Sequence, residues 1–309
     1  MKILITGSTG MVGRNIIESN YFNNCTILKP KRKELDLSNM KAVRHYFEDN
    51  NPKMVIHCAG VVGGIQANIK NQVKYLSANT RIGLNVIMGA YEAGVNKFMN
   101  ISSSCMYPRN ALNPLAEESI LNGELEPTNE GYAIAKITST RLCEYITKQN
   151  SNFYYKTIIP CNLYGKYDKF DSQFSHMIPA VIKKIHEAKE HNLSEINIWG
   201  DGNARREFMF VDDLCDFIFY AKENFESVPQ NINVGLGHDF SINEYYRAIA
   251  SVIGYDGDFT YDLNKPIGMK QKLIDDTKLK KFGWRYKTHL QDGLRKTYNY
   301  YLMSVLNGK

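Results

Sequence analysis

The sequence has few features of disulfide-bonded, zinc-binding or membrane proteins. Its six cysteines are scattered over 309 residues and none belongs to a CxxC pair, which argues against a disulfide framework and predicts no metal site. The start, MKILITGSTG, holds only a short apolar run, too short for a signal peptide, and no later stretch approaches the length of a membrane span. We therefore expect a cytoplasmic protein without membrane contact.

Long basic tracts are absent as well. The 38 lysines and arginines outnumber the 32 aspartates and glutamates to give a net charge of +6, which would help to attract an anionic ligand but is modest for this length. No run of basic residues is interleaved with aromatic ones, so nucleic-acid binding is not expected. Hydrophobic residues make up 43% of the chain without low-complexity segments, which indicates a protein that is folded throughout.

What the first half contains is an alternation of short β-rich runs with helical segments. The runs are KILIT, CTILK, KMVIHC, KFMNI and FYYKTII. This alternation is typical of βαβ units and predicts an α/β fold with a doubly wound parallel sheet of the Rossmann type. After about Tyr164 the pattern loosens. We expect a dinucleotide-binding domain over residues 1–165. Residues 166–309 would mainly form a smaller substrate domain at the carboxyl edge of the sheet, with some segments returning to the sheet.

The stretch GSTGMVG follows the first predicted strand and opens the first predicted helix. Gly7, Gly10 and Gly13 would permit a tight turn, a close approach of the backbone to a pyrophosphate, and placement of that anion at the helix N-terminus. Because the strand, the glycine spacing and the helix agree, we predict a dinucleotide site here rather than a purely structural turn.

Basic residues follow the second predicted strand, where many NAD-specific sites carry a carboxylate. Lys31, Arg32 and Lys33 would neutralise a 2′-phosphate, which favours NADPH over NADH, with Arg32 as the direct contact. The alternative interpretation is a solvated loop of ordinary charge.

A tyrosine and a lysine stand four residues apart in EGYAIAK, hence on one face of a helix. Tyr132 would donate a proton to a forming alkoxide, and Lys136 would lower the pKa of the phenol from its reference value of about 10. The same spacing occurs in YDLNK at Tyr261 and Lys265, but that segment has the composition of a loop. Ser103, just after the strand KFMNI, would hold the substrate carbonyl and complete a triad for carbonyl reduction.

Longer motifs resemble those of a known family. GSTGMVG, VVGGIQAN, SSSCMYP, LEPTNEGYAIAK, SHMIP and WGDGNARREFMFVDD are similar to motifs of the extended short-chain dehydrogenases/reductases, and SSSCMYP and SHMIP in particular resemble the GDP-L-fucose synthase family. The similarity runs nearly end to end. It implies NADPH-dependent reduction of the 4-keto group of a GDP-4-keto-6-deoxy sugar, coupled to epimerisation at carbons 3 and 5. It also implies a homodimer that assembles through the predicted helices 77–93 and 137–149.

The resemblance assigns roles to individual residues. It places the carbonyl-binding serine on Ser103, and the catalytic cysteine and histidine on Cys105 and His176, which would remove and return protons at carbons 3 and 5. The structural alternatives are a small packed cysteine and a capping or core histidine. The expected cofactor contacts are Gly7, Thr9, Gly10, Met11, Val12, Gly13, Arg32, Asp36, Leu37, Ala59, Ser103, Tyr132, Lys136, Pro160, Asn162, Leu163 and His176. The expected contacts with the GDP moiety are Lys184, Trp199, Arg206 and Lys272.

Other functions stay open on the sequence alone. A 4-reductase without epimerase activity would use the same triad on a hexose or heptose that a separate enzyme has epimerised. A non-catalytic NADP-sensing regulator would not need the Tyr/Lys pair that is present. A 4,6-dehydratase would carry Asp-Glu where this chain has Cys105 and Met106, and a 4-epimerase usually lacks a Cys/His couple. Departures from the family pattern at Gly131, Cys161 and Gln271 bear on the sugar more than on the chemistry.

Overall fold

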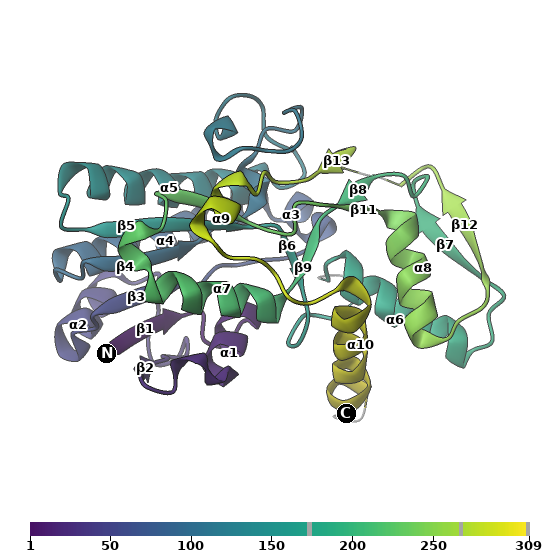
Figure 1. Cartoon of the computed structure of the whole chain (residues 1–309), viewed down its shortest axis with the longest axis horizontal. Helices are drawn as coiled ribbons and strands as arrows, with labels where there is room; N and C mark the ends of the chain where they lie inside the picture. The colour runs from purple at the N-terminus through teal and green to yellow at the C-terminus, as the bar shows by residue number, and fades with distance from the viewer. Residues whose placement is uncertain (172–174, 266–267, 307–309) are drawn as a thin grey trace.

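A six-stranded parallel sheet forms the centre of the computed structural model, which describes residues 1–171, 175–265 and 268–306 (Figure 1). The strand order is β10-β5-β4-β3-β1-β2. The strands are β1 (Lys2–Thr6), β2 (Thr26–Leu28), β3 (Met54–His57), β4 (Lys97–Ile101), β5 (Tyr154–Pro160) and β10 (Asn231–Val234). From β1 the chain extends to β2 on one side and to β3, β4 and β5 on the other. This is the predicted doubly wound sheet, and it leaves a crevice at the carboxyl ends beside β1.

Helices cover both faces of this sheet (Figure 1). They are α1 (Met11–Glu18), α2 (Met40–Asn50), α4 (Gln72–Glu92), α5 (Glu130–Gln149) and α7 (Val211–Glu223). Successive side chains of a strand point to opposite faces. Leu4 and Val55 therefore enter the core with α2, α4 and α5, whereas Ile3, Ile5 and Ile56 enter the core with α1 and α7. Both faces of the sheet carry apolar side chains, since helices cover both of them.

A smaller region with a separate core lies beyond the sheet, on the right of Figure 1. Its main elements are α6 (Met177–Glu190), β7 (Glu195–Trp199), α8 (Ile242–Ile253), β12 (Asp258–Asp262) and α10 (Leu290–Tyr300). Ile182 on α6, Ile198 on β7 and Ile249 on α8 pack in that core. The chain does not stay there, because α7 packs against α1 and β10 joins the main sheet. The domain boundary near residue 165 remains a prediction.

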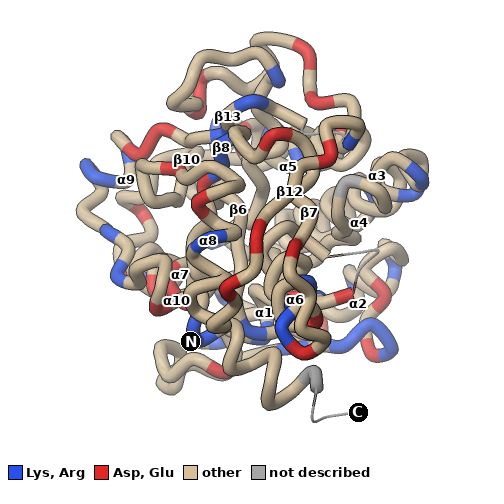
Figure 2. Tube along the Cα trace, turned by 90° about the vertical axis from the view of Figure 1, so that its right-hand side faces the viewer, with Lys and Arg blue, Asp and Glu red and all other residues tan. Residues whose placement is uncertain are grey.

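Several very short strands join the two regions. One three-stranded sheet contains β8 (Arg205–Arg206), β11 (Phe240–Ser241) and β13 (Gln271–Lys272), and a second small sheet pairs β6 (Asn162–Tyr164) with β9 (Phe208–Phe210). Figure 2 shows basic and acidic residues interspersed along the trace. In the part of the chain that the structure describes, no helix is both long and apolar enough to cross a membrane.

Candidate active site

A cleft of about 1270 Å³ is lined by residues of both regions. Residues that follow β1, β3 and β4 line it, together with residues of α5 and α6. Every residue predicted for the cofactor, for proton transfer or for the GDP moiety lies on the wall of this cleft. The structure thus brings the predicted residues together, while their individual roles remain proposals.

The glycine loop at one end of the cleft has the geometry that a pyrophosphate requires. Gly7 has a φ of +70°, and a Cβ atom there would lie 2.7 Å from the backbone nitrogen of Ala59. A Cβ at Gly13 would lie 2.3 Å from the carbonyl oxygen of Gly7. Gly10 precedes α1 and supplies no side-chain cap, so the first N–H groups of the helix stay available for an anion. The residues present therefore fit the pyrophosphate of a dinucleotide.

The loop after β2 distinguishes among the predicted basic residues. Arg32 lines the cleft, whereas Lys31 and Lys33 are not among the described residues of its wall. Asp36 Oδ1 accepts hydrogen bonds from the backbone N–H and the hydroxyl of Ser38, at 3.0 and 2.8 Å. These hydrogen bonds, with the nearby charge of Arg32, lower the pKa of Asp36. Of the three predicted basic residues, Arg32 is therefore the one that the described cleft wall includes.

The Tyr132–Lys136 pair lies on the first turns of α5. Lys136 Nζ donates a 2.8 Å hydrogen bond to the carbonyl oxygen of Ile101 and lies 5.8 Å from the centroid of the Tyr132 ring. Burial, with the neighbouring Cys105, raises the pKa of Tyr132, and burial lowers that of Lys136. The pKa of Tyr132 is therefore raised, whereas the sequence predicted that Lys136 would lower it. The cost of burying a phenolate dominates. Burial thus favours the protonated phenol, the form that a proton donor requires.

The second tyrosine–lysine pair of the sequence lies elsewhere. Tyr261 is on β12, is 45% exposed and donates a hydrogen bond to Asn243. Neither Tyr261 nor Lys265 lines the cleft. Of the two pairs, the described cleft wall contains Tyr132 and Lys136.

Cys105 lies directly after β4, in the turn η2 (Ser104–Met106). Its backbone N–H donates to Ser103 Oγ at 3.3 Å, which holds the serine hydroxyl next to the thiol. Burial raises the pKa of the Cys105 thiol, and the ammonium of Lys272 is the largest opposing influence. Burial thus favours the protonated thiol, the form that can donate a proton.

His176 approaches the cleft from the other region, as the residue immediately before α6. Its side chain is open to the cleft, yet the surrounding walls partly desolvate it, and two nearby lysines add positive charge. Both effects lower the pKa of His176, so the imidazole is neutral and can accept a proton. Cys105 and His176 thus supply one donor and one acceptor to the same cleft.

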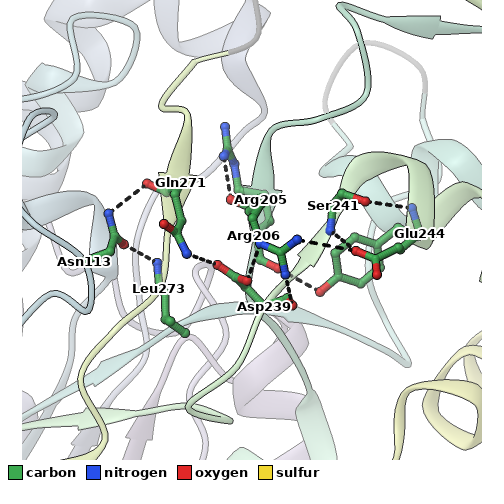
Figure 3. Close-up of polar contacts among 9 residues, drawn as sticks. Asn113, Arg205, Arg206, Asp239, Ser241, Glu244, Gln271 and Leu273 are labelled. Atoms are coloured by element: carbon green, nitrogen blue, oxygen red, sulfur yellow. Dashed lines mark hydrogen bonds and ion pairs between the residues drawn. The ribbon is translucent and has the colours of Figure 1, made fainter.

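Two cations predicted to hold the substrate lie on neighbouring short strands, where Lys272 pairs in register with Arg206. Side chains hold β13 in place (Figure 3). Gln271 Nε2 donates to Asp239 Oδ2 at 2.7 Å, and Arg205 Nε donates to Asp239 Oδ1 at 2.7 Å. Gln271, which departs from the family pattern, therefore helps to orient the strand that carries Lys272.

Glu207, which the sequence did not single out, holds the same strands from the buried side. It is 1% exposed, and Oε1 accepts the backbone N–H groups of Leu236 and Gly237 at 2.5 and 3.0 Å. Oε2 accepts the N–H of Ile274 at 3.1 Å, two residues after Lys272. Burial raises the pKa of Glu207 to about 7. This carboxylate connects β8 to two segments that are distant in sequence.

The far end of the cleft has the features of a base site. Trp199, at the end of β7, is 46% exposed, and Lys265 Nζ lies 5.7 Å from the centroid of its ring. Lys184 on α6 donates a hydrogen bond to the carbonyl of Asn197. An exposed indole beside cationic side chains can stack on a nucleobase.

Sequence reasoning missed further residues of the wall, among them Arg81, Glu126, Lys183 and Glu187. Lys183 and Glu187 follow His176 at helical spacing, so the periodicity of α6 could have identified them. Arg81 and Glu126 have no comparable signal, because they reach the cleft through tertiary contacts.

The doubly wound sheet, the glycine loop and the Tyr132–Lys136 pair in the cleft define an extended short-chain dehydrogenase/reductase that uses NADPH. The chain belongs to the NAD dependent epimerase/dehydratase family, whose model matches residues 3–235. The resemblance stated from the sequence motifs is thus confirmed.

Individual relatives are similar over nearly the whole chain. A GDP-L-colitose synthase from Yersinia pseudotuberculosis is 55% identical, with 98% of each chain covered. A GDP-L-fucose synthase from Azorhizobium caulinodans is 48% identical over 97% of this chain and 96% of the relative. A GDP-mannoheptose C4 reductase from Campylobacter jejuni, solved with NADP bound, is 32% identical and superimposes with a TM-score of 0.87 over 97% of this chain and 98% of the other.

Proposed function

We propose that this chain reduces the 4-keto group of a GDP-4-keto-6-deoxy sugar with NADPH and epimerises the sugar before reduction. The observation that carries the proposal is the presence of two proton-transfer groups in one cleft. Ser103, Tyr132 and Lys136 form the reduction triad, and Cys105 and His176 form a separate donor–acceptor pair. The names of the relatives support a GDP-linked sugar as the substrate class.

Each residue has a task in this chemistry. NADPH, when bound, supplies the hydride for carbon 4. Ser103 and Tyr132 hold the carbonyl oxygen, and Tyr132 gives its proton to the alkoxide that forms there. The carbonyl also acidifies the hydrogens on carbons 3 and 5, which the Cys105–His176 pair would remove and return from opposite sides. Arg206 and Lys272 would neutralise the diphosphate.

The names of the two relatives of 55% and 48% identity give two candidates for the sugar. Colitose lacks the 3-hydroxyl group that fucose carries, so carbon 3 is a stereocentre only in a fucose precursor. Supplying both GDP-4-keto-6-deoxymannose and its 3-deoxy analogue with NADPH, and identifying the products by NMR, separates the two.

Solvent exchange tests the epimerase part of the proposal. In D₂O with NADP⁺ in place of NADPH, the enzyme should incorporate deuterium next to the carbonyl without any hydride transfer. Cys105→Ser replaces a thiol of reference pKa about 8.5 by a much weaker acid, so exchange should fall by about two orders of magnitude or more. Reduction of an already epimerised ketone should persist, because the triad is intact. Wild-type enzyme that reduces its ketone without exchange would instead be a simple 4-reductase.

We also propose a cytoplasmic homodimer. All six cysteines are free thiols, as is usual in a reducing compartment. Leu76, Leu84 and Ile134 on α4 and α5 are exposed and line one shallow groove, which suits a four-helix contact between two copies. Sedimentation velocity of the wild type and of Leu84→Glu tests the assembly.

A further inference from the structure

One face of α6 forms a wall of the cleft from the chemistry to the base site. His176, Ala180, Lys183, Lys184 and Glu187 all line the cleft. The last four follow His176 by four, seven, eight and eleven residues, which places them on one side of a helix with 3.6 residues per turn. Glu187 lies near the middle of this stripe, so its side chain is directed to the cleft rather than to the opposite, buried face.

The length of α6 places Glu187 at the nucleotide end. Glu187 follows His176 by eleven positions, and a rise of 1.5 Å per residue separates them by about 16 Å along the helix axis. His176 is at the sugar, so a distance of this size reaches past the diphosphate to the base. The neighbouring Lys184 is hydrogen-bonded to Asn197, two residues before Trp199, which ties this part of α6 to the indole expected to stack on the base.

Among the described residues of the cleft wall, three are carboxylates: Asp36, Glu126 and Glu187. Asp36 is hydrogen-bonded to Ser38 at the adenosine end, and Glu126 accepts from Thr128 at 3.1 Å. Within the described ranges, the ion pair of the Glu187 carboxylate is with Lys183 at 3.8 Å, which is longer than a hydrogen bond, and burial together with this carboxylate's charge raises the pKa of the nearby Tyr301. It is therefore the cleft carboxylate with free acceptor capacity at the base end.

We propose that Glu187 selects guanine by accepting hydrogen bonds from N1–H and from the 2-amino group of the base. A carboxylate only accepts, and guanine presents two adjacent donors that match its two oxygens. Lys183, beside it, faces the O6 acceptor. Adenine and uracil each turn at least one acceptor toward the carboxylate, so they are repelled rather than merely unbound. The inference rests on the proposed GDP-sugar function and names the residue that gives it base specificity.

Calorimetric titration of the NADP⁺-loaded protein with GDP, IDP and UDP tests this without turnover. GDP and IDP differ only by the 2-amino group, so the wild type should bind GDP about tenfold more tightly than IDP. In Glu187→Ala the GDP:IDP ratio should fall to about one, because neither nucleotide keeps the carboxylate. Glu187→Gln should give an intermediate ratio, since one carbonyl acceptor remains.

Glu190→Ala is the matched control, on the same helix but not on the cleft wall. It should leave the GDP:IDP ratio at the wild-type value. A GDP-selective wild type whose ratio is the same in Glu187→Ala overturns the assignment of Glu187 and leaves the proposed function intact. A wild type that binds UDP as tightly as GDP overturns both, and the two failures are thereby distinguished.

Discussion

The two ends of the cleft, which we propose bind phosphate groups, are built by different physical means. At the cofactor end, the proposed contacts come from the backbone. Gly7 and Gly13 permit a turn in which a Cβ atom would meet neighbouring backbone atoms, and the N-terminus of α1 presents its N–H groups. At the substrate end, the proposed phosphate contacts are the side chains of Arg206 and Lys272, which extend from strands of two residues each. One site is built into the path of the chain, and the other depends on charged side chains held in position.

The supporting interactions differ accordingly. The glycine loop is anchored by regular parallel pairing, since β1 pairs with β2 and β3 along its length. The short strands β8 and β13 rely on Glu207 and Asp239, two carboxylates that are hydrogen-bonded to segments far away in sequence. A substitution in the glycine loop should therefore cause a large loss of cofactor affinity, because it blocks a rigid turn. A substitution at the substrate end should cause a smaller loss of substrate affinity, because several contacts together hold the short strands.

The largest effect is expected on kcat, for a substitution of Tyr132, which lies between the two ends of the cleft. Tyr132→Phe removes only the proton that the forming alkoxide receives, so kcat should drop by about 10³-fold. NADPH and GDP should bind as in the wild type, since neither end of the cleft is altered. Stopped-flow absorbance of NADPH oxidation and separate binding titrations measure the two effects. Substantial retained turnover would exclude Tyr132 as the acid.

The rigidity of the cofactor end can be broken by one methyl group. In Gly13→Ala the new Cβ would lie 2.3 Å from the Gly7 carbonyl oxygen, which is backbone and cannot move aside. NADPH affinity should fall about 100-fold, equivalent to ~2.7 kcal/mol. Fluorescence titration with NADPH measures the loss, and calorimetry with GDP is the control that should change less than twofold. Equal losses for both ligands would mean that the two ends are not independent.

The cofactor end was also the more predictable from sequence. The motif GSTGMVG and the alternation of strands and helices depend on neighbours in the chain, so local patterns suffice for the sheet and the loop. The substrate end has strands of two residues, which carry no periodicity, and their supports join positions such as Asn113 and Leu273. Glu207 gave no signal because its partners are backbone N–H groups that only the fold brings together. The pKa of Tyr132 was predicted in the wrong direction for a related reason, since burial is not visible in a motif.

A smaller effect is expected for the contact that we propose between the Arg32 side chain and the cofactor's 2′-phosphate. Arg32→Ala should weaken NADPH about tenfold and leave NADH unchanged, because only NADPH has the phosphate that Arg32 neutralises. Lys33→Ala, a neighbour that is not on the described cleft wall, is the matched control and should change neither affinity. Losses of equal size for NADPH and NADH would show that the cluster is a solvated loop.

The smallest effects are expected for Glu207, which supports the short strands of the substrate end. Burial raises the pKa of Glu207 to about 7 in the folded protein, from 4.5 for an ordinary glutamate. The folded state therefore binds this proton more tightly than the unfolded chain, so its stabilising contribution is complete below about pH 4.5 and is lost as pH rises to about 7. Glu207→Gln has no such proton, so the wild type should lose a few degrees of melting temperature relative to Glu207→Gln between pH 5 and 7.5. Asp168, whose pKa is also raised to about 7, is present in both proteins and cancels in the difference.

Glu207→Gln should also affect substrate binding. It keeps one carbonyl acceptor but turns an amide donor toward the backbone N–H groups, so Lys272 and Arg206 should be less well fixed. The KM for the sugar nucleotide should rise about fivefold while NADPH affinity stays constant. Parallel melting curves across this pH range, or an unchanged KM, would remove Glu207 from the support of the substrate end.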